Sequence, residues 1–299
     1  MWIICTLLTF ACWGIADLFY KLGNRKEFKY SHLITGIIVG LVMGIHATIF
    51  LLVTKTNINF IDILKYLPVS FFYISSMVIG YKGLKYLELS ISSPVQNTSG
   101  VITAILLLIF FKERYDLPFY IAVLLIFIGI FFLSYIEVQQ NKHKRIEYRQ
   151  RTKRSIVLTY TIIFPLVYCF LDGAGTFLDS IYLDKLSLIS EDTALVAYEY
   201  TFLIYGIITY IYLKTKKVKI KIFKEKPKLY AAIFETAGQF FYVYAMSGNA
   251  TVSAPIVGSY CVLSLLLSRV FLKEKLSIKE YISIFLVLIG IIILAIMDI

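Results

Sequence analysis

The chain has 299 residues, of which 59% are hydrophobic and only 16% are charged. Soluble domains are usually about 45–50% apolar, so this composition excludes an ordinary soluble fold and predicts a protein that lies largely in lipid. The formal net charge is +11, but the Lys and Arg residues lie between apolar runs. They do not form a basic groove with stacking aromatics, which argues against nucleic acid as a partner.

Apolar runs of about 20 residues follow one another along the chain, and a helix of that length crosses a hydrocarbon core of roughly 30 Å. The sequence therefore predicts an all-α integral membrane protein with ten transmembrane helices. We expect these helices at residues 2–20, 32–53, 66–84, 89–111, 118–137, 155–182, 193–213, 229–247, 250–271 and 278–297. The first run lacks a basic leader and a small-residue cleavage pattern, so we expect it to be the first helix and not a removed signal peptide.

The two halves of the chain resemble each other. At a shift of 161 residues, identical residues align without gaps, among them Tyr81 with Tyr242, Pro94 with Pro255 and Gly129 with Gly290. A chance match between apolar runs is the alternative, but a shared Pro, a shared Gly and a shared Lys-Glu pair argue against it. Because each copy has five helices, an odd number, the second must enter the membrane in the opposite orientation, as in inverted-repeat transporters. We expect a first repeat, a basic cytoplasmic linker and a second repeat at 1–137, 138–154 and 155–299.

Basic residues in short loops are retained on the cytoplasmic side of a membrane. Most of the 30 Lys and Arg residues lie in or beside the odd-numbered loops between the predicted helices. The opposite face holds only Lys55, Lys65, Lys112, Arg114 and Lys185. This asymmetry predicts a cytoplasmic 138–154 loop and extracellular termini. Attraction to anionic lipid is an alternative use of the basic loops, although the fixing of topology is sufficient to explain them.

Several motifs resemble the drug/metabolite transporter superfamily, specifically its ten-helix EamA-type members. They are Trp13-Gly14, the segment SSPVQNTSGVITAILLLIFFKE from Ser92, its counterpart SAPIVGSYCVLSLLLSRVFLKE from Ser253, and the glycine helices GIFFL and GIIIL from Gly129 and Gly290. The similarity covers nearly the whole chain. It implies two inverted five-helix repeats and a central cavity lined by helices 1, 3, 4, 6, 8 and 9. It also implies substrates ranging over amino acids, quaternary amines, nucleotide sugars and drugs.

Cofactor and catalytic motifs are absent from the sequence. The four cysteines lie inside apolar runs without metal-ligand spacing, so we expect neither a zinc site nor a disulfide framework. The sequence contains no GxxxxGK[ST], HExxH or GxSxG motif. We therefore expect no cofactor, no enzyme activity and no ATP-driven pumping, and energy would come from a gradient.

Ionisable side chains at membrane depth cost a few kcal/mol each on insertion scales, which makes them candidates for function. Asp17 lies four residues after Trp13, so the two share one helix face and place an aromatic wall beside a carboxylate. A cation would fit there. The alternative is that Asp17 lies at the interface, solvated or paired with Lys21.

On the sixth predicted helix, Asp172, Thr176 and Asp179 are spaced as i, i+4 and i+7, with glycines between them that allow close helix approach. We predict that Asp172 and Thr176 bind substrate, whereas Asp179 is interpreted either as part of this stripe or as the start of an outer loop. For Glu235, a candidate on the eighth predicted helix, the alternative is a carboxyl group that burial neutralises and that is hydrogen-bonded within the bundle.

The eighth predicted helix carries Glu235, Gln239 and Tyr242 at the same spacing, which directs a carboxylate, an amide and a phenol to one side. Glu199 lies inside the seventh helix and is predicted either to bind substrate or to bond a neighbouring helix. Tyr81 is the repeat mate of Tyr242 and is expected at a symmetric position on the cavity. Carboxylates beside aromatic rings favour an ammonium group.

Pro94 and Pro255 occupy equivalent positions near the starts of the fourth and ninth helices. A proline there frees backbone carbonyls, so we predict gating hinges, with ordinary helix-start geometry as the alternative.

Together these features predict a secondary transporter of a small polar metabolite, cationic or zwitterionic, such as an amino acid or amine. Transport would proceed by alternating access with coupling to protons at Asp172 or Glu235, or by exchange or facilitated diffusion. The alternatives are a lipid translocase with the same fold and a non-transporting receptor or assembly subunit. The expected setting is a bacterial plasma membrane, as a monomer or homodimer.

Overall fold

The computed structural model describes residues 1–24, 28–85, 92–93, 96–112, 114–149, 163–220, 222–273 and 276–297. Every regular element in these residues is helical, as the sequence predicted. The first half contains α1 (Trp2–Gly23), α2 (Ser31–Thr54), α3 (Phe60–Leu84), α5 (Thr98–Phe111) and α6 (Leu117–Arg149). The second half contains α8 (Ile163–Ser180), the π-helical turn η1 (Ile181–Lys185), α9 (Glu191–Thr215), the short η2 (Ile222–Lys224), α10 (Lys226–Val257), α11 (Cys261–Phe271) and α12 (Ile278–Met297).

Six of the described helices are long and apolar enough to cross a membrane, and α10 with α11 forms a seventh, bent candidate. Two shorter apolar helices, Thr98–Phe111 and Leu117–Leu133, occupy the positions of the predicted fourth and fifth spans. In the described residues, the helical segments therefore follow the predicted order.

Helix α3 begins at Phe60, earlier than the predicted start at residue 66. The reason is a capping box, in which Asn59 and Asp62 exchange side-chain and backbone hydrogen bonds across the first turn. The charge of Asp62 made this stretch resemble a loop, although an acidic residue in the first turn stabilises a helix through its dipole.

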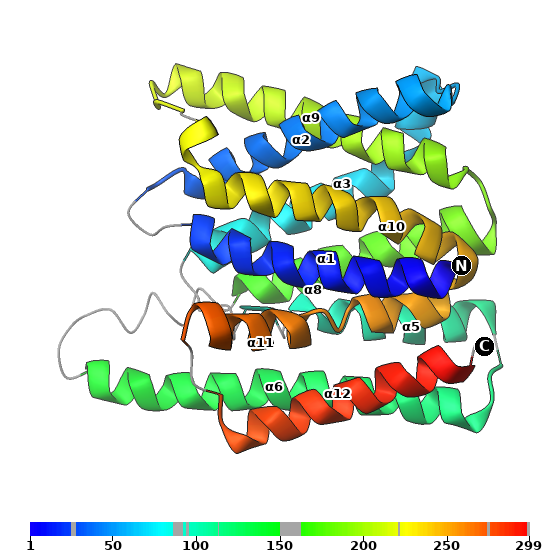
Figure 1. Cartoon of the computed structure of the whole chain (residues 1–299), viewed down its shortest axis with the longest axis vertical. Helices are drawn as coiled ribbons and strands as arrows, with labels where there is room; N and C mark the ends of the chain where they lie inside the picture. Colours follow the sequence, from blue (N-terminus) through cyan, green and yellow to red (C-terminus); the bar gives the residue numbers. More distant parts are fainter. Residues whose placement is uncertain are drawn as a thin grey trace.

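The eighth and ninth predicted helices, 229–247 and 250–271, have different boundaries in the structure. Helix α10 continues to Val257 across a kink at Asn249, whose φ of −162° and ψ of 90° are not helical. At this kink the chain turns back along the bundle (Figure 1). A second break, with a bend of 44°, separates α10 from α11. The ninth predicted helix is therefore broken into two parts. The first part is the end of α10 after the kink, and the second part is the whole of α11.

Two further boundaries differ from the prediction. Helix α6 continues to Arg149, well into the predicted 138–154 linker, so the first part of that segment is helical. Helix α8 is described from Ile163, and the predicted start of the sixth helix at residue 155 lies outside the described residues.

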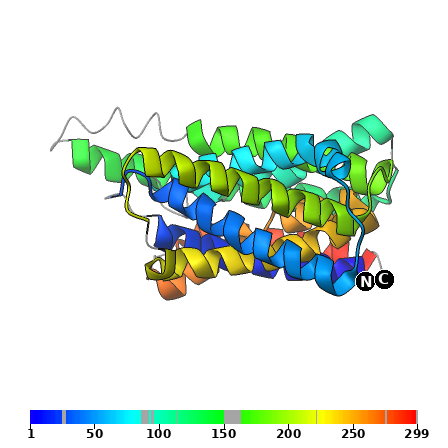
Figure 2. The same ribbon diagram turned by 90° about the horizontal axis from the view of Figure 1, so that it is seen from above.

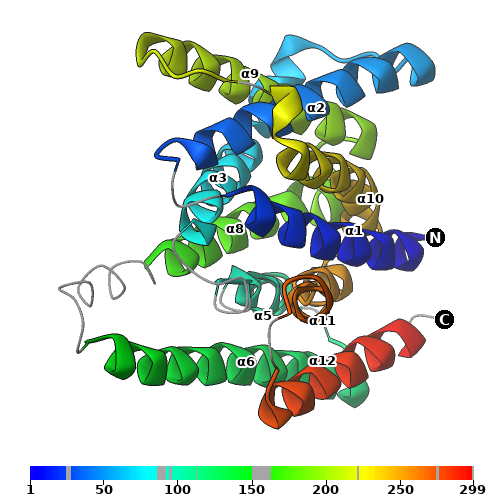
Figure 3. The same ribbon diagram turned by 60° about the vertical axis from the view of Figure 1, so that its left-hand side comes forward.

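The helices lie roughly side by side in paired layers (Figure 1). The pair α2 and α9 forms one end of the stack and the pair α6 and α12 forms the other, as Figure 3 shows from a second direction. Between these pairs lie α1, α3, α5, α8, α10 and α11. Both chain termini lie at the same end of the helices (Figures 1 and 2), which we call the terminal end.

Helix contacts repeat when the two halves are exchanged. Helix α1 packs along α10, and the equivalent helices α8 and α3 pack in the same way. The contacts of α3 with α9 and of α5 with α8 have counterparts in α10 with α2 and in α11 with α1. The pairs α2 with α9 and α6 with α12 each join equivalent helices. This pattern is that of a pseudo-two-fold axis between two related five-helix copies, as an inverted repeat requires.

The crossing of α6 and α12 shows the same symmetry at the level of single residues. A Cβ built on Gly129 would meet the Ser283 carbonyl oxygen and Val287, and a Cβ on Gly290 would meet the Ala122 carbonyl oxygen and Ile126. A shift of 161 residues converts each of these contacts into the other. The two glycines thus allow close backbone approach, the interaction that drives helix association in lipid.

Gly290→Ala is expected to lower the free energy of unfolding by roughly 1–3 kcal/mol, the usual cost of overpacking a well-packed contact. The added Cβ would lie 2.7 Å from the carbonyl oxygen of Ala122, and Gly129→Ala would meet Val287 at 2.5 Å. The apparent melting temperature of the purified protein in detergent measures the effect. Gly173→Ala is the matched control, because its nearest neighbour atom would be at an ordinary 3.7 Å. Equal melting temperatures for the three variants would contradict this packing.

Candidate functional site

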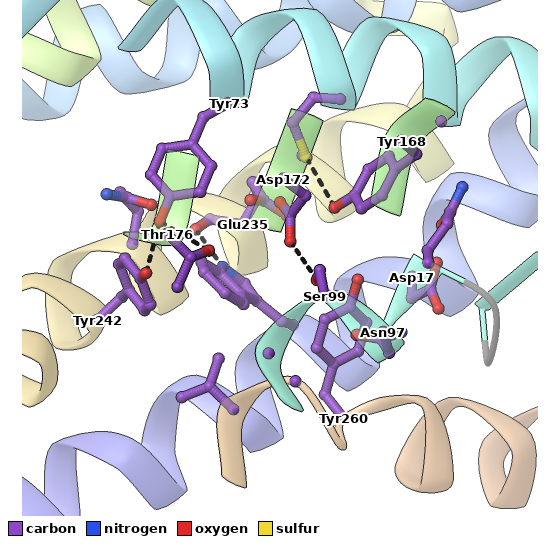
Figure 4. Close-up of a pocket in the computed structure, with 18 of the residues that line it drawn as sticks. Asp17, Tyr73, Asn97, Ser99, Tyr168, Asp172, Thr176, Glu235, Tyr242 and Tyr260 are labelled. Atoms are coloured by element: carbon purple, nitrogen blue, oxygen red, sulfur yellow. Dashed lines mark hydrogen bonds between the residues drawn. The ribbon is translucent and has the colours of Figure 1, made fainter. Parts of the chain in front are cut away.

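A cavity lies between the helices at the centre of the bundle. It contains about 800 Å³ of atom-free space, part of which is open to the surroundings. Its walls come from α1, α3, α5, α8, α10 and the residues between α10 and α11, with Tyr198 added from α9. These are the helices that the family resemblance implied. Figure 4 shows their polar side chains directed toward one another.

Eight of the predicted site residues line this one cavity: Trp13, Asp17, Tyr81, Asp172, Thr176, Glu235, Gln239 and Tyr242. They come from four helices, α1, α3, α8 and α10, and are separated by up to 229 residues in sequence. Tyr81 and Tyr242, the repeat mates, both reach the cavity, as the internal symmetry predicted. The structure therefore brings these side chains together, although it does not by itself test whether they bind substrate.

Asp172 lies on the wall formed by α8. The Ser99 hydroxyl of α5 donates a hydrogen bond of 2.6 Å to its Oδ2 (Figure 4). About one turn further along α8, Gly175 allows close approach to α3, since a Cβ there would lie only 3.1 Å from the Tyr73 ring. The carboxylate is thus fixed in position between α8 and α5 while it remains at the cavity surface.

Asp17 is buried, with 5% of its surface exposed. Its Oδ2 accepts a hydrogen bond of 2.5 Å from the Ser93 hydroxyl, and the Asn97 amide donates to the Ser93 carbonyl at 2.8 Å. Lys21 donates to the Leu84 carbonyl oxygen at 3.2 Å. The interpretation of Asp17 as a solvated interface residue is therefore wrong, because the side chain is enclosed by the bundle.

Glu235 faces the cavity from α10 and is 6% exposed. The Trp13 indole N–H donates to the Glu235 backbone carbonyl at 3.4 Å, and the Trp13 ring lies 4.9 Å, centroid to centroid, from the ring of Tyr242. Gly238 permits this contact, because a Cβ there would meet the indole ring. One turn further along α10, Gln239 lies in the same wall, and its amide nitrogen is buried without a partner in the described residues.

Hydrogen-bonded tyrosines line the part of the cavity nearer the terminal end. The hydroxyls of Tyr73 and Tyr242 lie 2.6 Å apart, and Tyr73 donates to the Thr176 hydroxyl at 3.1 Å (Figure 4). Toward the other end, Tyr81 donates to the Tyr20 hydroxyl at 3.0 Å. The cavity thus lies between two tyrosine pairs.

Several lining residues were not predicted from the sequence. The main ones are Tyr20, Tyr73, Asn97, Ser99, Tyr168 and Tyr260. Tyr73, Met77 and Tyr81 are four residues apart on α3 and share a face, so spacing alone contained a signal for Tyr73. Asn97 and Ser99 belong to the motif that follows Ser92, but a polar residue beside a cavity has the same local pattern as one that bonds a neighbouring helix.

Glu199 does not line the cavity. It is completely buried between α9 and α2, where both carboxylate oxygens lie within 2.9 Å of His46 Nδ1. Of the two predicted roles for this residue, the geometry matches the bond to a neighbouring helix, and we remove Glu199 from the candidate site.

Asp179 does not begin an outer loop. Its side chain is completely buried in α8, and the Tyr66 hydroxyl of α3 donates to its Oδ1. Pro255 is buried in the last turns of α10, shortly before the bend to α11. Pro94 lies outside the described residues. Among the described residues no group of three or more His, Cys, Asp or Glu side chains is placed to hold a metal ion.

Comparisons with known proteins agree with this architecture. The model of the EamA-like transporter family matches residues 1–135 and 158–296, one stretch in each half of the chain. A solved structure called "Crystal structure of protein" superposes on this chain with a TM-score of 0.67, and the match covers 98% of each chain. The sequence identity is 11%, so this likeness shows the fold alone. None of the curated proteins matches this chain.

The fold, the internal symmetry and the family match define a multi-pass membrane transporter of the drug/metabolite type. The chain belongs to the EamA-like transporter family, a ten-helix membrane fold.

His46→Ala is expected to destabilise the protein by roughly 3–5 kcal/mol, because it leaves the buried Glu199 carboxylate without its partner. Ligand-induced stabilisation should remain, since neither residue lines the cavity. Thermal melting with and without a bound ligand measures both quantities. A His46→Ala protein with normal stability but no ligand response would contradict the structural role and return Glu199 to the site.

Proposed function

We propose that this transporter carries a small organic cation or zwitterion, such as an amine or amino acid, by alternating access. The observation that carries the proposal is the charge of the cavity. Three carboxylates, Asp17, Asp172 and Glu235, line it, and no Lys or Arg is found among its described lining residues. A cavity with this balance of charge attracts a positively charged ligand.

The energetic argument rests on desolvation. Carboxylates at membrane depth are costly unless a cation or a proton compensates their charge. The hydroxyls of Ser93 and Ser99 donate hydrogen bonds to Asp17 and Asp172 but carry no charge. Lys21 lies one turn after Asp17, and its charge acts on that carboxylate from outside the cavity lining. A substrate ammonium group would supply the missing positive charge. Binding would thus be strongest for ligands that bring a cation into the site.

Aromatic rings complement the carboxylates. Trp13 lies against Tyr242 at 4.9 Å and edge-on to Tyr260 at 6.0 Å, so three rings from different segments stand beside the acidic groups. Ring faces attract cations by roughly 0.5–2 kcal/mol each when the site is desolvated. This arrangement suits an alkylammonium group, whose methylene groups also contact the rings.

Two buried amide groups indicate that the substrate also carries a hydrogen-bond acceptor, away from its positive charge. The side-chain nitrogens of Gln96 and Gln239 line the cavity and have no hydrogen-bond partner in the described residues. A buried donor without an acceptor costs about 1–3 kcal/mol, so an acceptor on the substrate would be favourable. A carboxylate or carbonyl oxygen would satisfy these groups, which is why an amino acid is included in the proposal.

Alternating access would be a movement of the two halves around this site. The Tyr73–Tyr242 hydrogen bond joins α3 of the first half to α10 of the second, so opening the terminal end requires it to break. Substrate sites at the interface of inverted repeats are typical of secondary transporters. We assign the moving units to 1–137 and 155–299. We further propose a bacterial plasma membrane, extracellular termini and a cytoplasmic 138–154 segment.

A screen for ligand-induced thermal stabilisation of the purified protein tests the substrate class. Amino acids, polyamines, choline-like amines, nucleosides and drugs are compared, and an amine or amino acid is expected to raise the melting temperature. Asp172→Asn and Glu235→Gln are each expected to weaken its binding about 10–100-fold, as loss of a charged hydrogen bond of roughly 1.5–3 kcal/mol predicts.

Asp116→Asn is the matched control, because Asp116 is exposed in the loop before α6 and does not line the cavity. Stabilisation by anionic lipid or neutral ligands alone would overturn cation recognition. Amine transport that is unaltered in the Asp172→Asn, Glu235→Gln double variant and independent of pH would overturn the carboxylate-centred mechanism.

Pro255→Ala tests the predicted hinge in the broken ninth helix. If residues near Pro255 flex during transport, the variant should slow uptake into liposomes several-fold while ligand-induced stabilisation stays unchanged. Uptake should change without a change in ligand binding, because the proline does not line the cavity. A hinge residue affects the rate of the conformational change between the two halves. Normal uptake would mean that the proline serves only helix geometry.

A further inference from the structure

A second buried acidic group lies outside the cavity. Asp179 is completely buried near the end of α8 and is not among the residues that line the cavity. Tyr66 donates a hydrogen bond to its Oδ1, whereas its Oδ2 has no partner in the described part of the chain. An enclosed carboxyl oxygen that accepts no hydrogen bond is unusual, because buried polar groups are nearly always satisfied.

The surroundings of Asp179 contain phenols. The titratable groups that interact with it are Tyr66 and Tyr73 of α3, Tyr198 of α9 and Tyr242 of α10. The nearest lysine in sequence, Lys185, forms an ion pair of 2.7 Å with Asp184. Phenols donate hydrogen bonds but do not neutralise charge, so an ionised Asp179 would be a buried charge without a counter-ion, which is strongly unfavourable.

A proton on Oδ2 removes the uncompensated charge, which is the larger of the two costs. It neutralises the carboxyl group, and it makes the oxygen without a partner the hydroxyl of a carboxylic acid. The Tyr66 hydrogen bond to Oδ1 is retained in this form, because the carbonyl oxygen of a carboxylic acid still accepts. The packing of α3 against α8 therefore needs no change when the proton is present.

Asp179 is also connected to the substrate cavity. Thr176, one turn earlier on α8, lines the cavity and accepts the hydrogen bond from Tyr73. Tyr73 is bonded in turn to Tyr242, which interacts with Asp179. The hydrogen-bonded side chains that join the two halves at the cavity thus also surround the buried acid.

We propose that Asp179 is a proton-binding site, separate from the substrate site, whose protonation accompanies closure of the terminal end. The proton comes from water when that end is open and forms the O–H bond at Oδ2, and it leaves to water on the other side of the membrane once the opposite end has opened. This inference deepens the proposed transport function, which it requires, and it assigns the coupling proton to Asp179 instead of the cavity acids.

Infrared difference spectroscopy tests the proposal without a substrate. Purified protein in liposomes is stepped from acidic to alkaline buffer, and the carbonyl stretching band of protonated carboxylic acids is recorded. We expect Asp179→Asn to remove one component of this band that Asp116→Asn leaves in place, because Asp116 is exposed. A band that is identical in the wild type and in Asp179→Asn, at every pH, would overturn the proposal.

Tyr66→Phe provides a second variant if Asp179→Asn does not fold. It keeps the carboxyl group but removes the donor to Oδ1, so the midpoint of the pH titration of the Asp179 band should move. An unchanged midpoint would contradict the assignment of the band to this carboxyl group. Neither spectrum depends on a ligand. The experiment can therefore overturn the proton site while the proposed amine specificity still stands, and the reverse is also true.

Proton transport across the liposome membrane tests whether the Asp179 site is coupled to substrate transport. Liposomes that contain a pH-sensitive dye are given a gradient of the amine that most stabilises the wild-type protein. Wild type is expected to move protons with this amine, and Asp179→Asn is expected to lose proton movement while it still exchanges labelled amine across the membrane. Proton movement that persists in Asp179→Asn and disappears in Asp172→Asn would place the coupling site in the cavity instead.

Discussion

The cost of placing a carboxylate away from water is the constraint on which the organisation of this protein depends. Acidic side chains lie on α1, α8, α9 and α10 at depths where the neighbouring residues are apolar, and the structure accommodates each in a distinct way. Glu199 is matched with His46, Asp17 and Asp172 accept hydroxyl donors at the cavity, and Asp179 is surrounded by phenols. His46 is the partner of Glu199 that can carry a positive charge, whereas no Lys or Arg is found among the described residues that line the cavity. The cavity acids are therefore suited to a charge that arrives with the substrate.

The second organising feature is close packing between equivalent helices. In lipid the hydrophobic effect does not drive helices together, so small residues that let backbones approach contribute much of the association. Gly129 and Gly290 play equivalent parts in the crossing of α6 and α12, and Gly100 and Gly258 lie against each other where α5 meets the end of α10. The latter contact lies in the wall of the cavity. The pseudo-two-fold axis thus passes through the region where the substrate is proposed to bind.

Binding and movement are linked by the same side chains. Tyr242 packs against Trp13, hydrogen-bonds to Tyr73 across the two halves, and interacts with Asp179. A change at either the cavity or the buried acid is therefore expected to alter the contacts between the two halves. Such shared contacts are the physical form that coupling takes when a ligand and a proton bias one conformational equilibrium.

The sequence alone determined the helical membrane architecture, the repeat and the acidic residues of the cavity. Runs of apolar residues set the spans, because lipid leaves no other way to satisfy the backbone, and the unusual acids with their i, i+4 and i+7 neighbours marked Asp172 and Glu235. The tertiary structure decided what spacing along one helix does not contain: that His46 meets Glu199, that Ser93 and Ser99 reach Asp17 and Asp172, and that Asp179 is enclosed by Tyr66. These partners come from other helices, and their positions depend on how close the glycine-bearing crossings allow the backbones to come.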